Sequence, residues 1–250
     1  MNERRAYILM VFSIPILWGI AVKASGLPAF VIPPPSLVAK VLIEVAGEFW
    51  FHTRATLEEA FAGYLIANVI SLTLAVSFLY LPEFESFITP WMVLIRNIPF
   101  VTIASIMVIT LGSDSPIPKL VIVVLITFYP ILANVIKGLK SVDPVLLDRM
   151  EVLHASKWQV FIKVRWPTAL PYYVAANEIS FTASIIGAIA GEWLFAKRGL
   201  GFVIVRALMQ YRADRLYAAT LISSVLSVGA YILVKAIERW LFRWKADIRD

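Results

Sequence analysis

The sequence contains no cysteine and only two histidines, and charged residues make up 16% of its 250 positions. Without cysteine the chain forms no disulfide and carries no thiol chemistry. The low charge and a mean hydropathy of +0.80 exclude an ordinary soluble domain. The glycine-rich pattern Gly-x-x-x-x-Gly-Lys-Ser/Thr, which holds nucleotide phosphates, does not occur. Any ATP chemistry linked to this protein must therefore lie on another subunit.

Residue combinations that indicate catalysis are also missing. No Ser/His/Asp set and no cluster of paired carboxylates is visible. His52 and His154 fall on opposite sides of the membrane in the topology derived below, so one copy cannot pair them around a metal. The net charge of +6 calls for no nucleic acid, because basic residues flanking membrane spans explain it. We expect no catalytic, cofactor-binding or metal-binding residues on this chain.

Long apolar runs are what the chain has in abundance. A helix needs about 20 mostly apolar residues to cross the hydrocarbon of a bilayer. The predicted spans are residues 7–22, 60–81, 91–111, 117–136, 172–195 and 216–237. They leave no room for a second soluble domain, so residues 1–250 are predicted to form a single all-α transmembrane domain. Arg4 and Arg5 precede the first run as in a signal peptide, but Pro15 and Trp18 favour a retained span.

The distribution of lysine and arginine predicts the orientation. With both termini in the cytoplasm, thirteen basic residues lie inside and nine outside, with Arg96 unassigned. The bias is modest because residues 196–215, on the outside, are themselves basic. Residues 36–56, between the first two spans, are too charged to cross. Their amphipathic pattern predicts a helix at the outer surface or packed across neighbouring spans.

A polar, basic segment separates the fourth and fifth predicted spans, at residues 141–171. Asp143 and Pro144 are typical of a helix N-cap and first residue. Ser156 and Gln159 fit a capping box, which predicts a second helix after a sharp turn. We expect the two prolines at 167 and 171 to end that second helix before the next apolar run.

The same segment resembles the cytoplasmic coupling loop of binding-protein-dependent ABC importer permeases, with the nitrate/sulfonate/taurine type closest. The family loop typically reads S-V-D-P-x-L-L-E-A-A-x-x-L-G-A-S-x-W-Q and ends in L-P-x-A-L-P. The matching residues are Ser141 to Pro144, Leu146, Leu147, Ala155 to Gln159 and Pro167 to Pro171. The family's Glu-Ala-Ala falls on Asp148-Arg149-Met150 and its glycine falls on His154, so the acidic charge is retained but the small residues are not.

Further motifs extend the resemblance over most of the chain. Residues 30–36 resemble the turn after the family's first span, and residues 96–99 resemble its R-P-I-P. Residues 128–134 resemble F-F-P-I-L-L-N, and 191–192 and 199–201 resemble the late A-E and G-L-G. The order and spacing of these short motifs around the loop are hard to produce by chance.

The resemblance implies a type I importer permease with about six transmembrane helices in the bacterial inner membrane. It also implies a homodimer of permeases, two ABC ATPase subunits that bind ATP and Mg²⁺, and an extracytoplasmic solute-binding protein. The implied ATPase-coupling loop spans 137–171, with Asp143, Pro144, Leu147, Asp148, Arg149, Met150, Leu153, His154, Ala155, Ser156 and Lys157 as its site residues. From periodicity alone, a solvated cytoplasmic hairpin is an equal alternative.

Arg96 interrupts an apolar run, between Trp91 and Pro99. A charge at membrane depth costs about 2.5–3.5 kcal/mol on insertion scales, so it should face a cavity, a partner or the interface. Arg96, Asn97 and Pro99 are therefore candidates for the translocation path, with Arg96 attracting an anion. The alternative is an arginine that extends to the cytoplasmic interface near Trp91.

The fifth span supplies four further candidates for the path or gate: Glu178, Gly187, Gly191 and Glu192. The two glycines belong to a small-residue stretch that permits close helix contact, so tight packing is the alternative for them. Glu192 is either a pathway group or an interfacial carboxylate. The turn at 197–201 is predicted outside, where it contacts the binding protein, forms a gate or is an ordinary surface turn.

A self-contained secondary transporter or an intramembrane enzyme would be a different class of membrane protein. The first usually shows internal repeats and intramembrane acids, and the second needs clustered His, Asp or Glu. Neither pattern is present, and neither class needs a docking helix between two spans. We therefore predict an importer permease for a small solute, in the nitrate, sulfonate, taurine, pyrimidine, riboflavin or aromatic acid range.

Overall fold

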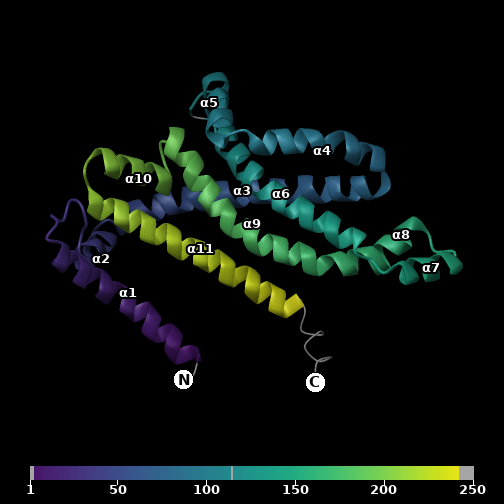
Figure 1. The fold of residues 1–250 in the computed structure, drawn as a ribbon. Helices are drawn as coiled ribbons and strands as arrows, with labels where there is room; N and C mark the ends of the chain where they lie inside the picture. The colour runs from purple at the N-terminus through teal and green to yellow at the C-terminus, as the bar shows by residue number, and fades with distance from the viewer. Residues whose placement is uncertain (1–2, 114, 242–250) are drawn as a thin grey trace.

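Four long helices run side by side and form the body of the molecule. The computed structural model describes residues 3–113 and 115–241. α3 (Ala46–Tyr80), α6 (Ile117–Lys140), α9 (Trp166–Phe195) and α11 (Ala213–Leu241) are the four long helices (Figure 1). By length and composition, all four can cross a membrane.

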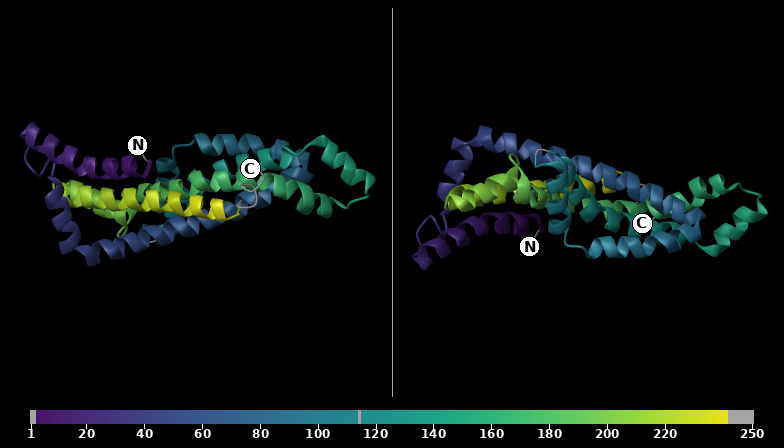
Figure 2. Two further views of the ribbon diagram at one scale, coloured as in Figure 1. Left: turned by 90° about the horizontal axis from the view of Figure 1, so that it is seen from below. Right: turned by 90° about the horizontal axis from the view of Figure 1, so that it is seen from above.

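Shorter helices surround this bundle. α1 (Glu3–Ser25), α2 (Pro35–Glu44) and α10 (Leu200–Met209) lie toward one end, as the views from below and above show (Figure 2). α7 (Pro144–Val152) and α8 (Lys157–Val160) project at the opposite end. α4 (Pro82–Asn97) and α5 (Phe100–Leu111) follow α3. The two ends of the bundle therefore carry different helices, which gives the molecule a polarity.

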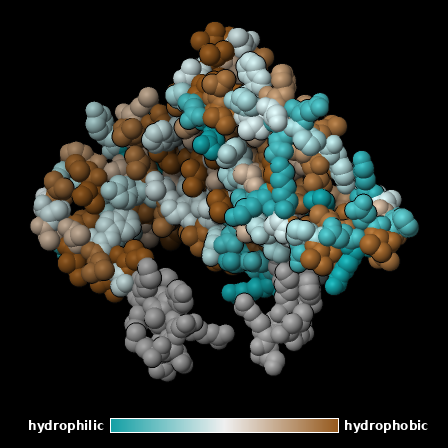
Figure 3. Space-filling view, turned by 45° about the vertical axis from the view of Figure 1, so that its right-hand side comes forward, coloured by the Kyte–Doolittle hydropathy of each residue, from teal (hydrophilic) through white to brown (hydrophobic). Residues whose placement is uncertain are grey.

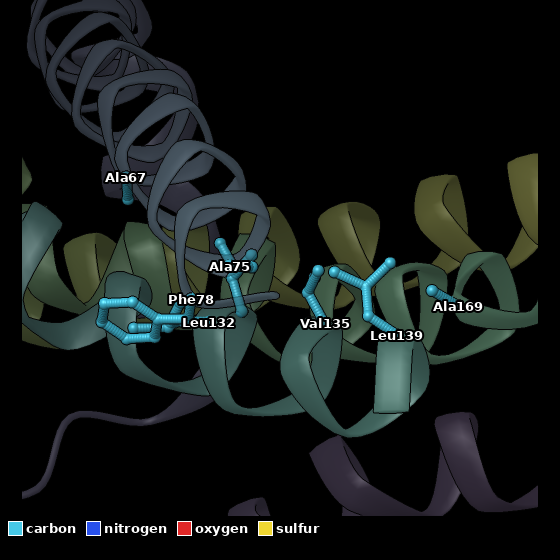
Figure 4. Close-up of a cluster of buried hydrophobic side chains, with 8 residues drawn as sticks. Ala67, Ala75, Phe78, Leu132, Val135, Leu139 and Ala169 are labelled. Atoms are coloured by element: carbon cyan, nitrogen blue, oxygen red, sulfur yellow. The ribbon is translucent and has the colours of Figure 1, made fainter. Parts of the chain in front are cut away.

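The core lies where α3, α6 and α9 meet. Its fully buried side chains are Ala67, Ala75, Phe78, Ile131, Leu132, Val135, Leu139 and Ala169, most of them labelled in Figure 4. Alanine is frequent in this set because small side chains let helix backbones approach closely in a membrane, where dispersion contacts drive packing. The large side chains come mainly from α6, which lies between the other two helices.

Glycine permits the closest of these approaches. A Cβ placed on Gly138 of α6 would lie 2.8 Å from the Cα of Ala169 on α9, and one on Gly63 of α3 would lie 2.6 Å from the Cβ of Val123 on α6. Both distances are below 3.0 Å, a separation that Cβ atoms in proteins essentially never show from a non-bonded heavy atom. The separation of these helices is therefore set by the absence of a side chain at 63 and 138.

The predicted span 91–111 is not one continuous helix. α4 ends at Asn97, α5 begins at Phe100, and the two helices are bent by 89°. Ile98, the residue before Pro99, has extended backbone angles of −75° and 128°. Proline disfavours the helical region for the residue before it, and at Ile98 the chain takes the extended alternative, which breaks the helix.

Two other predictions, about where helices begin and end, were wrong. Pro167 and Pro171 do not end the second helix of the loop, because α8 continues through a π-helical segment, Phe161–Arg165, into α9. Residues 157–194 thus form one helical span. The amphipathic helix expected over 36–56 is two helices, since α2 ends before Val45 and α3 starts after it.

The remaining predicted spans coincide with helices. α1 contains the first of them, although the part of it with described side chains, Ser13–Ser25, is shorter than a full span. α3 begins well before residue 60 and ends at Tyr80. With the bent pair α4–α5 counted as one span, the described residues contain up to five membrane spans by length and composition.

The close contact at Gly138 generates a prediction for stability. We expect Gly138→Ala to destabilise the protein by about 1–3 kcal/mol, because the added methyl group meets the backbone of α9. Gly229→Ala on α11 is the matched control, since no atom lies within 4 Å of its added Cβ. Thermal denaturation in detergent measures both variants. Equal melting temperatures would contradict a backbone contact at 138.

Candidate functional site

A short helical hairpin, residues 141–160, projects beyond the end of the bundle (Figure 1). Both predicted helix starts are confirmed. The Asp143 side chain accepts a hydrogen bond from the backbone N–H of Val145 at 2.9 Å. Ser156 and Gln159 form the reciprocal capping box, with distances of 3.3 and 2.8 Å. These caps satisfy backbone donors that a short, exposed helix cannot satisfy internally.

His154 forms the turn between the two helices. Its backbone has a φ of 50°, in the left-handed region. His154 N donates to Glu151 O at 2.8 Å, and Ala155 N donates to Met150 O at 3.0 Å. These two bonds satisfy the last carbonyls of α7 in the way that a glycine C-cap does. The family glycine at this position is absent, but the left-handed turn that it serves is present.

The tip of the hairpin exposes large apolar side chains. Val152, Leu153 and Trp158 are 78%, 73% and 65% exposed. Asp148 and Arg149 are also exposed, so apolar and charged groups alternate over this end of the molecule (Figure 3). Leu147, Met150 and Ala155 are partly buried, and Lys157 is exposed. An exposed apolar patch with a polar rim is typical of a protein interaction surface.

The hairpin is joined to the bundle by specific contacts. Arg165 Nη1 donates to the carbonyl of Leu139 at 2.9 Å, which links the start of α9 to the end of α6. Tyr80 Oη donates to the carbonyl of Lys157 at 3.3 Å, which links α3 to α8. The hairpin and the segment that follows it are therefore linked to α3, α6 and α9.

A second candidate feature is a cavity of about 470 Å³ at the junction of α4 and α5, against α6. Arg96, Asn97 and Pro99, three of the seven predicted pathway or gate residues, all line it. The Arg96 guanidinium lies over the ring of Tyr129, 4.4 Å from its centroid. We call this space the Arg96 cavity. It adjoins a smaller one of about 230 Å³ that shares Arg96 and Tyr129 and is otherwise apolar.

The Arg96 cavity lies between the two ends of the bundle, near the middle of α6. Lys140 Nζ pairs with Glu85 Oε2 at 2.7 Å where α6 ends and α4 begins. Arg96 is 11 residues beyond Glu85 (96 − 85), and Tyr129 is 11 residues before Lys140 (140 − 129). Eleven helical residues rise about 16 Å, roughly half the hydrocarbon thickness. This depth favours the pathway interpretation of Arg96 over an interfacial arginine.

Glu192 is a buried hydrogen-bonded group between α9, α3 and α10. It is only 1% exposed. Its two carboxylate oxygens accept bonds of 2.7 Å from the Thr56 hydroxyl and from the Gly201 backbone N–H. Leu200 N in turn donates to Thr56 Oγ1 at 2.9 Å. The carboxylate therefore fixes the first turn of α10 to α3.

Two glycines make room for this carboxylate. Gly199 has a φ of +113°, and a Cβ there would lie 2.1 Å from Glu192 Cδ. A Cβ on Gly201 would lie 2.3 Å from the carbonyl oxygen of Ile189. Gly199 N also donates to Nδ1 of the buried His52 at 3.0 Å. The Gly-Leu-Gly part of the predicted outer turn is thus buried, while Lys197 and Arg198 before it are exposed.

The other fifth-span candidates make contacts within the chain. Added Cβ atoms on Gly187 and Gly191 would lie 3.2 and 3.3 Å from side-chain atoms of α6, so both glycines serve the α6–α9 contact. Glu178 Oε2 pairs with Lys235 Nζ of α11 at 2.9 Å. These contacts favour a packing role for the glycines and a helix-linking role for Glu178.

A polar network across α3 and α9 was missed by sequence reasoning. The hydroxyl of Tyr64 donates to Asn177 Oδ1, and the hydroxyl of Tyr173 donates to Asn68 Oδ1. Each asparagine also donates from Nδ2 to the backbone carbonyl of the tyrosine four residues before it. The signal was present, since the pattern Tyr-x-x-Ala-Asn occurs in both helices. Lys119 and Glu59, a mostly buried ion pair, carry no such pattern.

Together these features define a polytopic α-helical membrane protein with a projecting helical hairpin and a cavity between the two ends of its bundle. The chain belongs to the family of binding-protein-dependent transport system inner membrane components, whose model matches residues 67–243. It is therefore a permease subunit of an ABC importer, a multi-pass transport protein of the inner membrane.

Individual relatives cover nearly the whole chain. It is 30% identical to a riboflavin transport system permease protein of Chloroflexus aurantiacus, over 93% of this chain and 87% of that protein. It is 28% identical to a formylaminopyrimidine transport permease protein of Halalkalibacterium halodurans, over 97% and 96% of the two chains. It is 25% identical to a taurine transport system permease protein of Escherichia coli, over 94% and 87%.

Solved structures share the fold. The inward-facing MetNI methionine ABC transporter matches with a TM-score of 0.62 at 19% identity, over 80% of this chain and 97% of that chain. An amino acid ABC transporter, solved with histidines, matches with a TM-score of 0.63 at 15% identity, over 80% and 96%. The type I importer fold predicted from the loop is confirmed.

The Glu192 contacts generate a prediction. We expect Glu192→Leu to lower the free energy of unfolding by about 1–3 kcal/mol, because the buried Gly201 N–H loses its acceptor, whereas the Thr56 hydroxyl keeps the His52 carbonyl at 3.2 Å. Glu58→Leu is the control, because Glu58 is exposed and its ion pair with Arg54 is worth about 0–1 kcal/mol. Melting temperatures in detergent compare the two. A loss no larger at 192 than at 58 would show that the carboxylate does not secure α10.

Proposed function

We propose that two copies of this chain form the pore of an importer, with an ABC ATPase docked on the hairpin of each copy. The observation that carries this proposal is the exposed apolar tip of a capped, polar hairpin that extends beyond the bundle. Leu153 is the main anchor, and Asp148, Arg149 and Lys157 form the rim that sets the register. ATP and Mg²⁺ bind to the ATPase partners.

Coupling follows from how the hairpin is attached. When ATP draws the two ATPases together, the hairpins move with them. Because Arg165 and Tyr80 tie the hairpin region to α6 and α3, the long helices move as the hairpin moves. ATP and a loaded binding protein both favour the outward-facing state, and hydrolysis returns the pore to the inward-facing state.

In the proposed topology both termini and the hairpin are cytoplasmic, and the end with α2 and α10 faces outward. The excess of lysine and arginine on the cytoplasmic side supports this orientation. An extracytoplasmic binding protein then delivers the solute to the end that carries α10. The relatives named for riboflavin, formylaminopyrimidine and taurine support a small organic solute.

A charge at the hairpin tip tests the docking. We expect Leu153→Asp to abolish co-purification of the ATPase and transport while the permease still inserts, because a carboxylate cannot be buried unpaired in an apolar pocket. Tyr211→Asp is the matched control: Tyr211 is 80% exposed at the opposite end, and its φ of 54° is one that aspartate tolerates. The measurement is a pull-down of tagged permease from native membranes with mass spectrometry of its partners.

Normal recovery of the ATPase with Leu153→Asp would contradict docking of the ATPase on the hairpin. Recovery of a wild-type permease alone that still transports without ATP would instead indicate a self-contained carrier.

Single cysteines test the orientation, since the chain has none of its own. We expect Lys157→Cys to react with a membrane-impermeant maleimide only after the cytoplasmic side is opened, and Lys197→Cys to react in intact spheroplasts. Both positions are exposed, so labelling reports sidedness rather than burial. If Lys197→Cys reacted only from the cytoplasm and Lys157→Cys only from outside, the proposed orientation would be wrong.

A further inference from the structure

We infer that the Arg96 cavity binds an amphiphilic organic anion, with its carboxylate or sulfonate on the Arg96 guanidinium and its apolar body against Tyr129 and the adjoining apolar space. The inference rests on the proposed function, since it names the chemical class of solute for the same pore. It goes further in assigning this recognition to particular residues of the permease.

The charge of Arg96 is available to a ligand. Its guanidinium contacts the face of the Tyr129 ring, and among the side chains that the structure describes it forms no ion pair. Two basic side chains of the bundle, by contrast, are neutralised within the chain: Lys119 pairs with Glu59, and Lys235 pairs with Glu178. A guanidinium has five N–H donors in a planar fork that matches a carboxylate or sulfonate, and stacking on a ring leaves them free.

The shape of the space selects an amphiphilic anion over a bare ion. The Arg96 cavity, at about 470 Å³, is within the range of small-molecule sites. The adjoining space of about 230 Å³ extends from Arg96 along apolar side chains, among them Ile70, Met92, Val124 and Phe128. An inorganic anion would lose its hydration beside this apolar wall and leave the wall unfilled, whereas an aromatic or alkyl body would cover it.

The position fits a solute that crosses the membrane. Arg96 and Tyr129 lie about 16 Å from the Lys140–Glu85 pair, near the middle of α6. The cavity lies beside the 89° bend between α4 and α5, where the chain leaves helical geometry. Irregular backbone and an intramembrane charge are tolerated where they line a cavity, and both mark a solute pathway.

The experiment uses 4-fluorobenzoate as the probe and the purified importer complex in detergent. Binding is measured from broadening of the fluorine NMR signal. We expect broadening with the wild type and a loss of about tenfold or more in apparent affinity with Arg96→Gln, because a charge-assisted hydrogen bond is removed. Arg206→Gln is the matched control: Arg206 is also exposed and lies over a ring, that of Phe202 at 5.9 Å, but lines neither cavity.

Two competitors and one uncharged analogue complete the design. Hexanesulfonate should displace the probe, and nitrate at the same concentration should not. 4-Fluorobenzamide, which lacks the charge, should respond equally in all three proteins and so corrects for uptake by detergent.

Absence of broadening in the wild type, or equal broadening with Arg96→Gln, would overturn the anion site. Displacement by nitrate as effective as by hexanesulfonate would overturn the amphiphilic class. These failures are distinct from failure of the proposed function. If the ATPase co-purifies and the probe does not bind, the proposed importer assembly is supported and the anion site is contradicted. If no ATPase is recovered, the same titration on the permease alone still decides the Arg96 site.

Discussion

The close packing of α9 against α6 is the contact on which the rest of the structure depends. Gly138 faces Ala169 near one end of this contact, and Gly191 faces Ile122 near the other. Because lipid is as apolar as leucine, helices in a membrane gain little from hiding apolar surface and associate through such close contact. This one interface carries the hairpin at its cytoplasmic end under the proposed topology and Glu192 at the opposite end.

The interior of the bundle also depends on how its polar groups are matched. A buried hydroxyl, amide or carboxylate costs free energy unless it is hydrogen-bonded. The two Tyr-x-x-Ala-Asn segments meet this requirement reciprocally, and the Glu192 carboxylate does so with donors from α3 and α10. Such bonds have direction, so they fix the rotation of each helix as well as its distance. Arg96 differs because none of the carboxylates that the structure describes pairs with it.

These features together connect the hairpin with the Arg96 cavity. Tyr80 links the hairpin to α3, Arg165 links the segment that follows the hairpin to α6, and Tyr129 lies near the middle of α6. A rigid α6 would therefore transmit a displacement of the hairpin to the wall of the Arg96 cavity. A solute held by Arg96 and Tyr129 would in this way experience the state of the ATPases without any contact with them.

The sequence by itself determined the features that depend on neighbouring residues. The caps at Asp143 and Ser156, the apolar spans and the family loop are local patterns, so they could be predicted. Only the tertiary structure decided the partners of Glu192, because Thr56 and Gly201 reach it from other helices. It also decided the bend at Pro99 and the helix that continues through Pro167. Proline restricts its own neighbourhood in every case, but whether a helix breaks or absorbs it depends on the packing around it.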